Sequence, residues 1–148
     1  MATDIKKVLS VYKIACNSHD LDKTISFFAD NGILEDVALG IVCNGKEAVD
    51  AFYASMLADF PDLKFEVKSI FTVGEWSAME WVMSGTHTHS TLTKNSIPAT
   101  CKTFAVRGTS IYQPNKGKLI KETAYYNLMT FLQQVGLMPV GLMPAQSK

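Results

Sequence analysis

The stretch LKFEVKSIFTVGEWSAMEWVMSGTHTH, residues 63–89, decides the fold. From Leu63 to Val73, apolar side chains come at every second position with one polar interruption, which is typical of a strand that buries one face. Gly74-Glu75 then predicts a turn, and the segment from Trp76 to His89 predicts the partner strand. The chain therefore contains at least one long antiparallel hairpin.

In the chain before this hairpin, apolar residues recur with the longer period that is typical of helices. Apolar residues at helical spacing predict helices over about residues 4–18 and 46–60, with a short helix after Asp20. A brief strand over 33–37 separates the second helix from the third, which Pro61 ends. The first part of the chain is therefore expected to be mainly helical.

The chain after the hairpin returns to the pattern of strands. Residues 101–113 and 119–126 predict a second antiparallel hairpin, because Pro114-Asn115-Lys116-Gly117 is a favourable turn. A polar loop over 90–100 precedes this hairpin, and a last helix covers 128–135. Helices first and hairpins afterwards predict an α+β fold, with the helices on one face of a curved antiparallel sheet.

The sequence shows no domain boundary inside the chain. With 148 residues it can bury roughly two-thirds of its unfolded surface around one core. We expect residues 1–137 to form a single domain and residues 138–148 to form a C-terminal tail. We interpret the tail as a strap or a frayed end.

Charge and hydropathy exclude several classes of partner. Lysines plus arginines and aspartates plus glutamates both number 14, whereas a nucleic-acid-binding domain usually has a basic excess. No apolar run approaches the ~20 residues that span a bilayer. We therefore expect neither nucleic acid nor a membrane as a partner.

The cysteines indicate a reducing compartment. Cys16, Cys43 and Cys101 are odd in number and form no Cys-x-x-Cys pair, so neither a disulfide framework nor a zinc site is predicted. The N-terminus lacks the apolar segment of a signal peptide. We expect three reduced cysteines in a cytoplasmic protein.

The strand around Trp81 carries the best candidate for chemistry. Alternation puts Trp81, Met83, Gly85 and His87 on one face, although the sequence does not fix whether this face is the concave one. His87 is the best general acid/base by residue type, because its ordinary pKa lies near neutrality. The alternative is a structural histidine near a strand end. His89 could make a metal pair with it, but no third ligand is identifiable.

Other charged residues have two readings each. Glu80 is either an inward base with a raised pKa or an outward ion-pair partner, and the apolar Trp81 beside it is the better inward candidate. Arg107 is either an anion or carbonyl clamp or a surface residue. The neighbours Glu35 and Asp36 point to opposite faces of a strand, so they are not an acid/base couple.

Several short motifs occur in a specific order. They are Asn44-Gly45-Lys46-Glu47-Ala48, Phe60-Pro61-Asp62-Leu63-Lys64-Phe65-Glu66-Val67, Glu80-Trp81-Val82-Met83-Ser84-Gly85-Thr86-His87-Thr88, Val106-Arg107-Gly108, Gly117-Lys118-Leu119-Ile120, Tyr125-Tyr126-Asn127-Leu128 and Gln134-Val135-Gly136-Leu137. Together they closely resemble the SnoaL-like polyketide cyclases (ester cyclases) of the nuclear transport factor 2-like superfamily. The resemblance extends over about residues 8–137.

The resemblance implies a cone-shaped α+β barrel, in which a curved antiparallel sheet wraps around the N-terminal and further helices. It also implies one deep apolar pocket, a homodimer, and neither a metal nor an organic cofactor. The family reaction is an intramolecular aldol closure, in which a carboxylate removes a proton next to a carbonyl group. That carboxylate belongs to a Tyr-Trp/Tyr-Asp motif on the last strand.

This sequence departs from the family motif at its most important position. The motif reads Tyr125-Tyr126-Asn127, and a neutral carboxamide is too weak a base to remove a proton near pH 7. Asn127 could still orient a carbonyl group, and asparagine is also a good N-cap for the last helix. Either another residue supplies the base, with His87 first and Glu80 or Glu35 next, or the pocket carries out chemistry that needs no strong base, or it only binds.

We therefore expect a protein that binds a small apolar carbonyl compound, with cofactor-free isomerase- or lyase-type acid/base chemistry such as aldol cyclisation or isomerisation. The alternative is a non-catalytic ligand-binding protein that lost the family's base. The candidate catalytic residues are His87, Asn127 and Glu80. The candidate substrate-binding residues are Trp81, Tyr125, Arg107, Met83, Tyr12 and Phe52.

Overall fold

The computed structural model describes residues 4–89 and 98–138. Within these residues the chain forms four helices and one six-stranded sheet. In chain order the elements are α1 (Ile5–Asn17), α2 (Leu21–Ser26), β1 (Phe28–Asp36), β2 (Ile41–Asn44), α3 (Lys46–Asp59), β3 (Lys64–Val73), β4 (Trp76–Thr86), β5 (Thr103–Asn115), β6 (Lys118–Tyr126) and α4 (Leu128–Gln134). The predicted α+β class is confirmed. Residues 139–148 of the predicted tail and residues 90–97 of the predicted loop lie outside the described residues.

The sheet is curved, open and mixed. Its strand order is β2-β1-β6-β5-β4-β3, and every neighbouring pair is antiparallel except β1 and β6, which are parallel. The prediction of a wholly antiparallel sheet is therefore wrong for one pair. β6 has antiparallel β5 on one side and parallel β1 on the other, which brings the C-terminal ends of β1 and β6 together.

Two strands differ from the sequence prediction. The four residues of β2 were not predicted, because so short a strand leaves no readable period. β1 begins five residues earlier than predicted and passes through Gly32, where its pairing with β6 shifts register. A Cβ atom at Gly32 would lie 2.9 Å from the Ala29 carbonyl oxygen, so glycine permits the close approach of the chain there.

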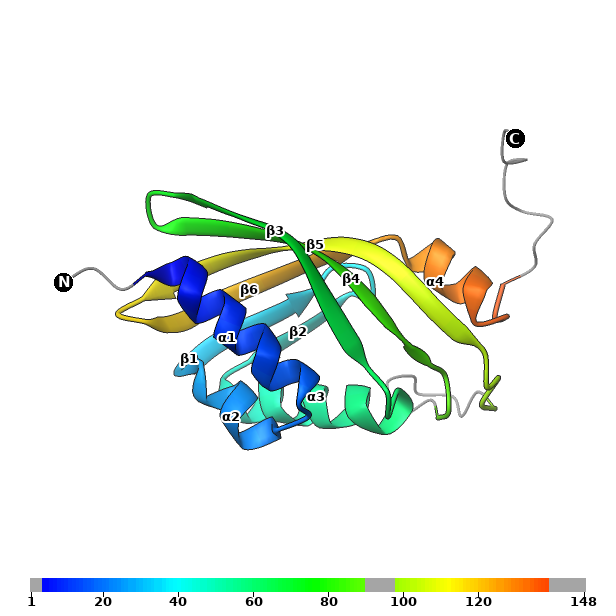
Figure 1. Cartoon of the computed structure of the whole chain (residues 1–148). Helices are drawn as coiled ribbons and strands as arrows, with labels where there is room; N and C mark the ends of the chain where they lie inside the picture. The colour runs from blue at the N-terminus through cyan, green and yellow to red at the C-terminus, as the bar shows by residue number, and fades with distance from the viewer. Residues whose placement is uncertain (1–3, 90–97, 139–148) are drawn as a thin grey trace, which may run out of the picture.

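The helices cover the concave face of the sheet. Figure 1 shows the sheet curving over α1 and α3, with α4 at the end of the molecule where β6 finishes. Asp4 caps α1 by accepting hydrogen bonds from the Lys6 and Lys7 amides. The inward stripe of α1 buries Leu9 and Tyr12, as predicted, but it also buries the ammonium-bearing Lys13.

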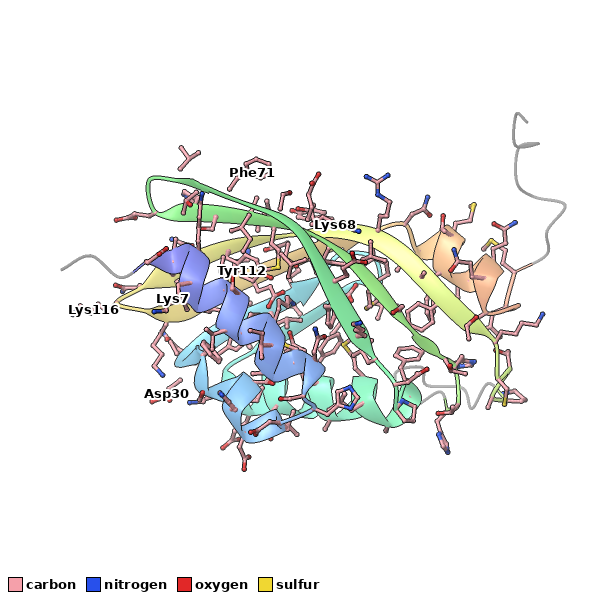
Figure 2. All side chains as sticks on the ribbon, in the orientation of Figure 1. Lys7, Asp30, Lys68, Phe71, Tyr112 and Lys116 are labelled. Atoms are coloured by element: carbon pink, nitrogen blue, oxygen red, sulfur yellow. The ribbon has the colours of Figure 1, made fainter. Side chains whose placement is uncertain are left out.

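The sheet register decides which side chains face the helices. β4 pairs with β5 without a break from Ser77 to Thr86, so no bulge lies at Gly85. Trp81, Met83 and His87 are all buried on the concave side. Figure 2 shows Tyr112 on the helix side of the sheet and Phe71 on the opposite side. Within the described residues, no helix is long and apolar enough to cross a membrane.

Candidate functional site

A cavity lies between the concave face of the sheet and helices α1, α3 and α4. Its outer part, here the outer hollow, has a volume of about 90 Å³ and is lined mainly by apolar side chains, among them Phe52, Met56, Phe60, Phe131 and Leu132. Its inner part, here the inner hollow, has a volume of about 30 Å³ and is lined by Lys13, Leu34, Phe65, Trp81, Ser110 and Glu122. Five residues line both parts, which makes them neighbours: Asp36, Phe52, Met56, Met83 and Tyr126.

Asp36 places a carboxylate on the wall that the two hollows share. It is the last residue of β1 and is only 5% exposed. The Leu39 amide donates to its Oδ1 over 2.9 Å, and the Tyr126 hydroxyl donates to its Oδ2 over 3.1 Å. Burial raises the pKa of Asp36, and these hydrogen bonds offset only part of that rise. Asp36 is therefore a buried carboxylate with enhanced basicity that borders the cavity.

His87 lies on the wall of the outer hollow, directly after β4. Its backbone amide donates to the Lys102 carbonyl oxygen, and its carbonyl oxygen accepts from the Cys101 amide, which fixes its position beside β5. The Thr100 amide donates to the ring Nδ1 over 3.3 Å. In the neutral ring the proton is therefore assigned to Nε2.

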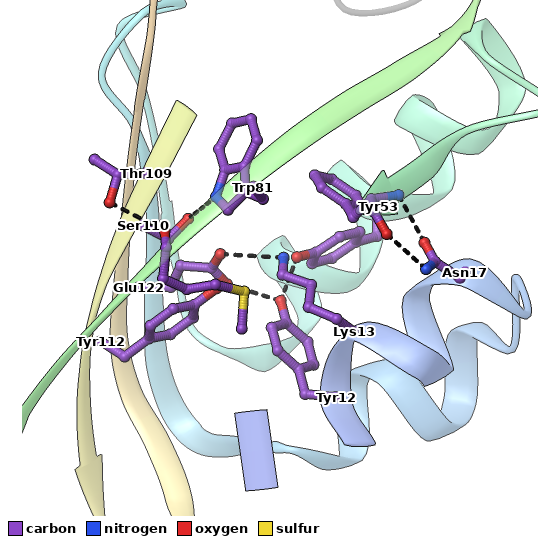
Figure 3. Close-up of polar contacts among 11 residues, drawn as sticks. Tyr12, Lys13, Asn17, Tyr53, Trp81, Thr109, Ser110, Tyr112 and Glu122 are labelled. Carbon is purple, nitrogen blue, oxygen red and sulfur yellow. Dashed lines mark hydrogen bonds and ion pairs between the residues drawn. The ribbon is translucent and has the colours of Figure 1, made fainter. Parts of the chain in front are cut away.

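A buried polar cluster lines the inner hollow (Figure 3). The Lys13 ammonium from α1 and the Glu122 carboxylate from β6 point toward each other, with Nζ and Oε1 3.7 Å apart. The Tyr12 hydroxyl donates to Glu122 Oε2 over 2.7 Å and is also hydrogen-bonded to the Tyr53 hydroxyl. Lys13 Nζ lies 4.2 Å from the ring centroid of Phe65. These contacts compensate for the burial of two opposite charges.

The tyrosines of this cluster stay neutral. Burial raises the pKa of Tyr12 and of Tyr53 well above the usual value, and the negative charge of Glu122 raises both further. Tyr112 behaves in the same way for the same two reasons. The tyrosine hydroxyls around Glu122 therefore retain the protons that let them act as hydrogen-bond donors.

Trp81 forms one wall of the inner hollow and lies over a glycine of the next strand. Trp81 pairs with Gly108 across β4 and β5, and its indole N–H donates to Ser110 Oγ over 3.0 Å. A Cβ atom at Gly108 would lie only 2.3 Å from the indole ring. The glycine therefore makes the space in which the indole closes the cavity on this side.

Sequence comparison identifies the family of this fold and cavity. The sequence model of the SnoaL-like polyketide cyclase family matches residues 6–135, which is most of the chain. The chain belongs to this family. No curated protein matches it.

Solved structures show the same fold as this SnoaL-like protein. IdmH from Streptomyces antibioticus, a proposed polyketide cyclase, is 20% identical with a TM-score of 0.75, over 90% of this chain and 99% of that one. A proposed polyketide cyclase from Xanthomonas campestris is 22% identical with a TM-score of 0.72, over 88% and 95% of the two chains. A Catenulispora acidiphila protein with a ketosteroid isomerase-like fold is 20% identical with a TM-score of 0.75, over 93% and 97%. At these identities the likeness shows the fold alone.

Four of the predicted site residues of this SnoaL-like protein line the cavity. His87 lies on the outer hollow, Trp81 lies on the inner hollow, and Phe52 and Met83 border both. Tyr12 is buried behind the inner hollow and reaches it through its hydrogen bond to Glu122. The structure therefore brings these residues together around one space.

Three other predicted residues lie on the opposite, convex face of the sheet. Glu80, Arg107 and Tyr125 are exposed there and line a separate, shallow depression. The Ser69 hydroxyl donates to Glu80 Oε2 over 2.6 Å, which satisfies this carboxylate at the surface. Two interpretations were given for each charged residue. The arrangement agrees with an outward position for Glu80 and a surface position for Arg107.

Asn127 caps α4 and lies outside both hollows. Its Oδ1 accepts from the Thr130 amide over 3.1 Å, and the residue is exposed. The cavity is lined instead by its neighbours Tyr126 and Leu128. The capping role expected from the sequence is confirmed, and the side chain that faces the cavity from this motif is that of Tyr126.

Sequence reasoning missed four charged residues that line the cavity, namely Lys13, Asp36, Asp59 and Glu122. Lys13 lies in the apolar stripe of α1, and Glu122 lies within the predicted last strand. In each case a charged residue on a face expected to be buried could have indicated the site. For Asp36 the signal was the adjacent pair with Glu35, one member of which had to face inward. His89 is exposed, and the described residues contain no group of three or more His, Cys, Asp or Glu that could hold a metal ion.

Proposed function

We propose that this SnoaL-like protein is a cofactor-free enzyme that binds a small apolar carbonyl compound and moves a proton on the carbon next to the carbonyl group. The observation that carries the proposal is the buried Asp36 carboxylate on the wall common to both hollows. A base for this chemistry must be in reach of the substrate and must have a pKa above that of an ordinary carboxylate. Asp36 meets both requirements.

The rest of the cavity supports this role. The apolar side chains of the outer hollow suit a hydrocarbon substrate, and they exclude the water that would compete for the base. The Tyr126 hydroxyl holds Asp36 Oδ2, which fixes the direction of the carboxylate. The proposed base thus replaces the carboxylate that the family motif would supply at Asn127.

The reaction has two steps. Asp36 takes the proton from the carbon, and the electron pair of the C–H bond becomes an enolate. In an isomerisation, the same proton returns at another carbon of the enolate. In an aldol cyclisation, the enolate carbon forms a bond to a second carbonyl carbon of the same molecule, whose oxygen then takes a proton. His87, with its assigned proton on Nε2, is the proposed acid for that oxygen. Asp36 then releases the proton that it took, and His87 takes one up, so that both side chains return to their starting states.

Two further features belong to the proposal. We propose a homodimer, because the convex face of the sheet exposes Phe71 and Trp76, with 59% and 50% of their surfaces accessible. Light scattering tests this proposal. We expect the wild type to have the mass of a dimer and Trp76→Lys to have the mass of a monomer, and a monomeric wild type would contradict the proposal.

We also propose the cytoplasm as the location, since all three cysteines are free.

Proton exchange on a model ketone tests the proposed activity. 1-Indanone and acetophenone are apolar carbonyl compounds whose exchange with D2O is readily followed by NMR. We expect the protein to bind at least one of them and to exchange its protons next to the carbonyl faster than buffer does. Binding without exchange would support the non-catalytic ligand-binding reading. Absence of binding by both would contradict the substrate class.

A further inference from the structure

The Lys13 ammonium has hydrogen-bonding capacity directed at the inner hollow. It carries three N–H donors, but its ion pair with Glu122 is 3.7 Å long, beyond hydrogen-bonding distance. Its other close neighbours are the faces of the Phe65 and Tyr12 rings, at 4.2 and 4.8 Å from the centroids. A buried ammonium in such surroundings gains from an additional oxygen acceptor.

The size of the inner hollow limits what that acceptor can be. Its volume of about 30 Å³ has room for roughly two water molecules. A single oxygen atom with the carbon that carries it fits there, whereas a ring does not. The apolar remainder of a ligand would have to stay in the outer hollow, among Phe52, Met56 and Leu132.

The charges around the hollow favour a neutral oxygen over an anion. Lys13 contributes one positive charge, and the carboxyl groups of Glu122 and Asp36 line the same hollow. A bound carboxylate would add a further negative charge beside two carboxyl groups in a poorly hydrated space. A ketone or aldehyde oxygen accepts from the ammonium without that repulsion.

We infer that the inner hollow is the subsite for the neutral carbonyl oxygen of the substrate, with Lys13 Nζ as the hydrogen-bond donor. This inference rests on the proposed function and names the end of the substrate that enters first. Because Asp36 lines both hollows, an oxygen at Lys13 places the adjacent carbon near the proposed base. When Asp36 removes the proton, the negative charge develops on the oxygen next to the ammonium. Lys13 is then a catalytic donor that stabilises the enolate.

Carbonyl spectroscopy of a bound ligand tests the contact without requiring turnover. 1-Indanone labelled with ¹³C at the carbonyl carbon is bound to the wild type and to the double variant Lys13→Met/Glu122→Gln. The glutamine keeps an oxygen that accepts from Tyr12, and the double change leaves no unpaired charge. We expect a downfield carbonyl ¹³C shift in the wild type that is lost in the double variant. Equal shifts in the two proteins would overturn the inference.

Affinity gives a second readout with a matched control. The preference for 1-indanone over indane, which lacks the oxygen, should fall by about 10-fold or more in the double variant, as expected for a hydrogen bond to a charged group. Lys7→Met makes the same substitution on an exposed part of α1 and should leave the preference unchanged. An unchanged preference in the double variant would contradict the role of Lys13.

Two further measurements keep the test decisive. If circular dichroism shows that the double variant does not fold, the wild type alone is tested with indane-1-carboxylate, which should bind at least about 10-fold more weakly than 1-indanone. Tighter binding of the carboxylate would overturn the inference. Asp36→Asn separates the two proposals, since it should abolish proton exchange but keep the downfield carbonyl shift. If the wild type shows the downfield carbonyl shift but no proton exchange, only the proposed activity is rejected.

Discussion

The hydroxyl of Tyr126 donates a hydrogen bond to Asp36 Oδ2 over 3.1 Å, although the two residues lie 90 positions apart in the sequence. The parallel pairing of β1 and β6, in which Asp36 is the partner of Ala124, brings the ends of both strands together. The tyrosine of the family motif thus holds a carboxylate from a different strand. The asparagine that follows it, Asn127, caps α4 instead.

Replacing Tyr126 with phenylalanine should make Asp36 harder to ionise. The hydroxyl stabilises the charged carboxylate and lowers its pKa, so its loss should raise the pKa of Asp36 further. The acidic limb of the pH–rate profile for 1-indanone exchange should therefore move to higher pH. The phenylalanine ring keeps the packing of Tyr126 against Trp81. A limb that stays in place or moves to lower pH would contradict this role of the hydrogen bond.

Asp36→Asn should stabilise the fold at neutral pH. Burial raises the pKa of Asp36 in the folded protein, so the folded state holds the proton at pH values where the unfolded chain has lost it. The free energy of unfolding of the wild type therefore falls as the pH rises from about 4, the ordinary pKa of aspartate, through the pKa of Asp36 in the folded protein. The melting temperature of the variant minus that of the wild type should increase over this range. A difference that shrinks as pH rises would show that the carboxylate is stabilised by its surroundings.

Asn127 should contribute to stability and little to proton transfer. Asn127→Ala removes the side-chain acceptor for the Thr130 amide and should cost about 0.5–2 kcal/mol in the free energy of unfolding, measured with urea. Asn127→Asp keeps the cap and adds the carboxylate of the family motif. Because the residue lies outside both hollows, neither variant should change the exchange rate of 1-indanone by more than a few-fold. A large gain in the exchange rate of Asn127→Asp would instead support a cyclase that lost the family's base at this position.

Gly108→Ala should displace Trp81. The added Cβ atom would meet the indole ring, and overpacking of this kind costs about 1–3 kcal/mol. In a Trp76→Phe background, where Trp81 is the remaining tryptophan, the fluorescence spectrum should report the displacement. Gly40→Ala is the control, because Gly40 has a positive φ but no atom within 4 Å of its Cβ position. An unchanged Trp81 spectrum in Gly108→Ala would contradict the packing argument.

Much of the fold follows from local patterns in the sequence. The helical stripes of α1 and α3 and the alternation in β4 were readable because each element buries one face over many residues. The prediction of one buried face was wrong for β3, where Phe65 is buried but Val67, Phe71 and Val73 are exposed. The parallel pairing of β1 with β6 was not readable, since it joins segments far apart in the chain and leaves no local period. The β-bulge in β3 between Val67 and Ser69 appeared in the sequence only as an interrupted alternation.

The candidate site was harder to predict than the fold. Alternation grouped Trp81, Met83 and His87 on one face, and the structure places that face toward the cavity. Asp36 and Lys13 could not be assigned in the same way, because their roles depend on which strand ends meet and on how α1 rotates against the sheet. A buried charge is costly, and the residues that compensate for it are distant in sequence.

The most direct measurement of the central claim is the rate of deuterium exchange next to the carbonyl of bound 1-indanone in Asp36→Asn. If Asp36 is the base, this variant should lose about 10²–10⁴-fold in rate while still binding the ketone. His87→Gln is the parallel variant and should keep exchange, because its proposed role is that of the acid in cyclisation. An Asp36→Asn protein that exchanges at the wild-type rate, together with loss of exchange in His87→Gln, would contradict the account and assign the base to His87.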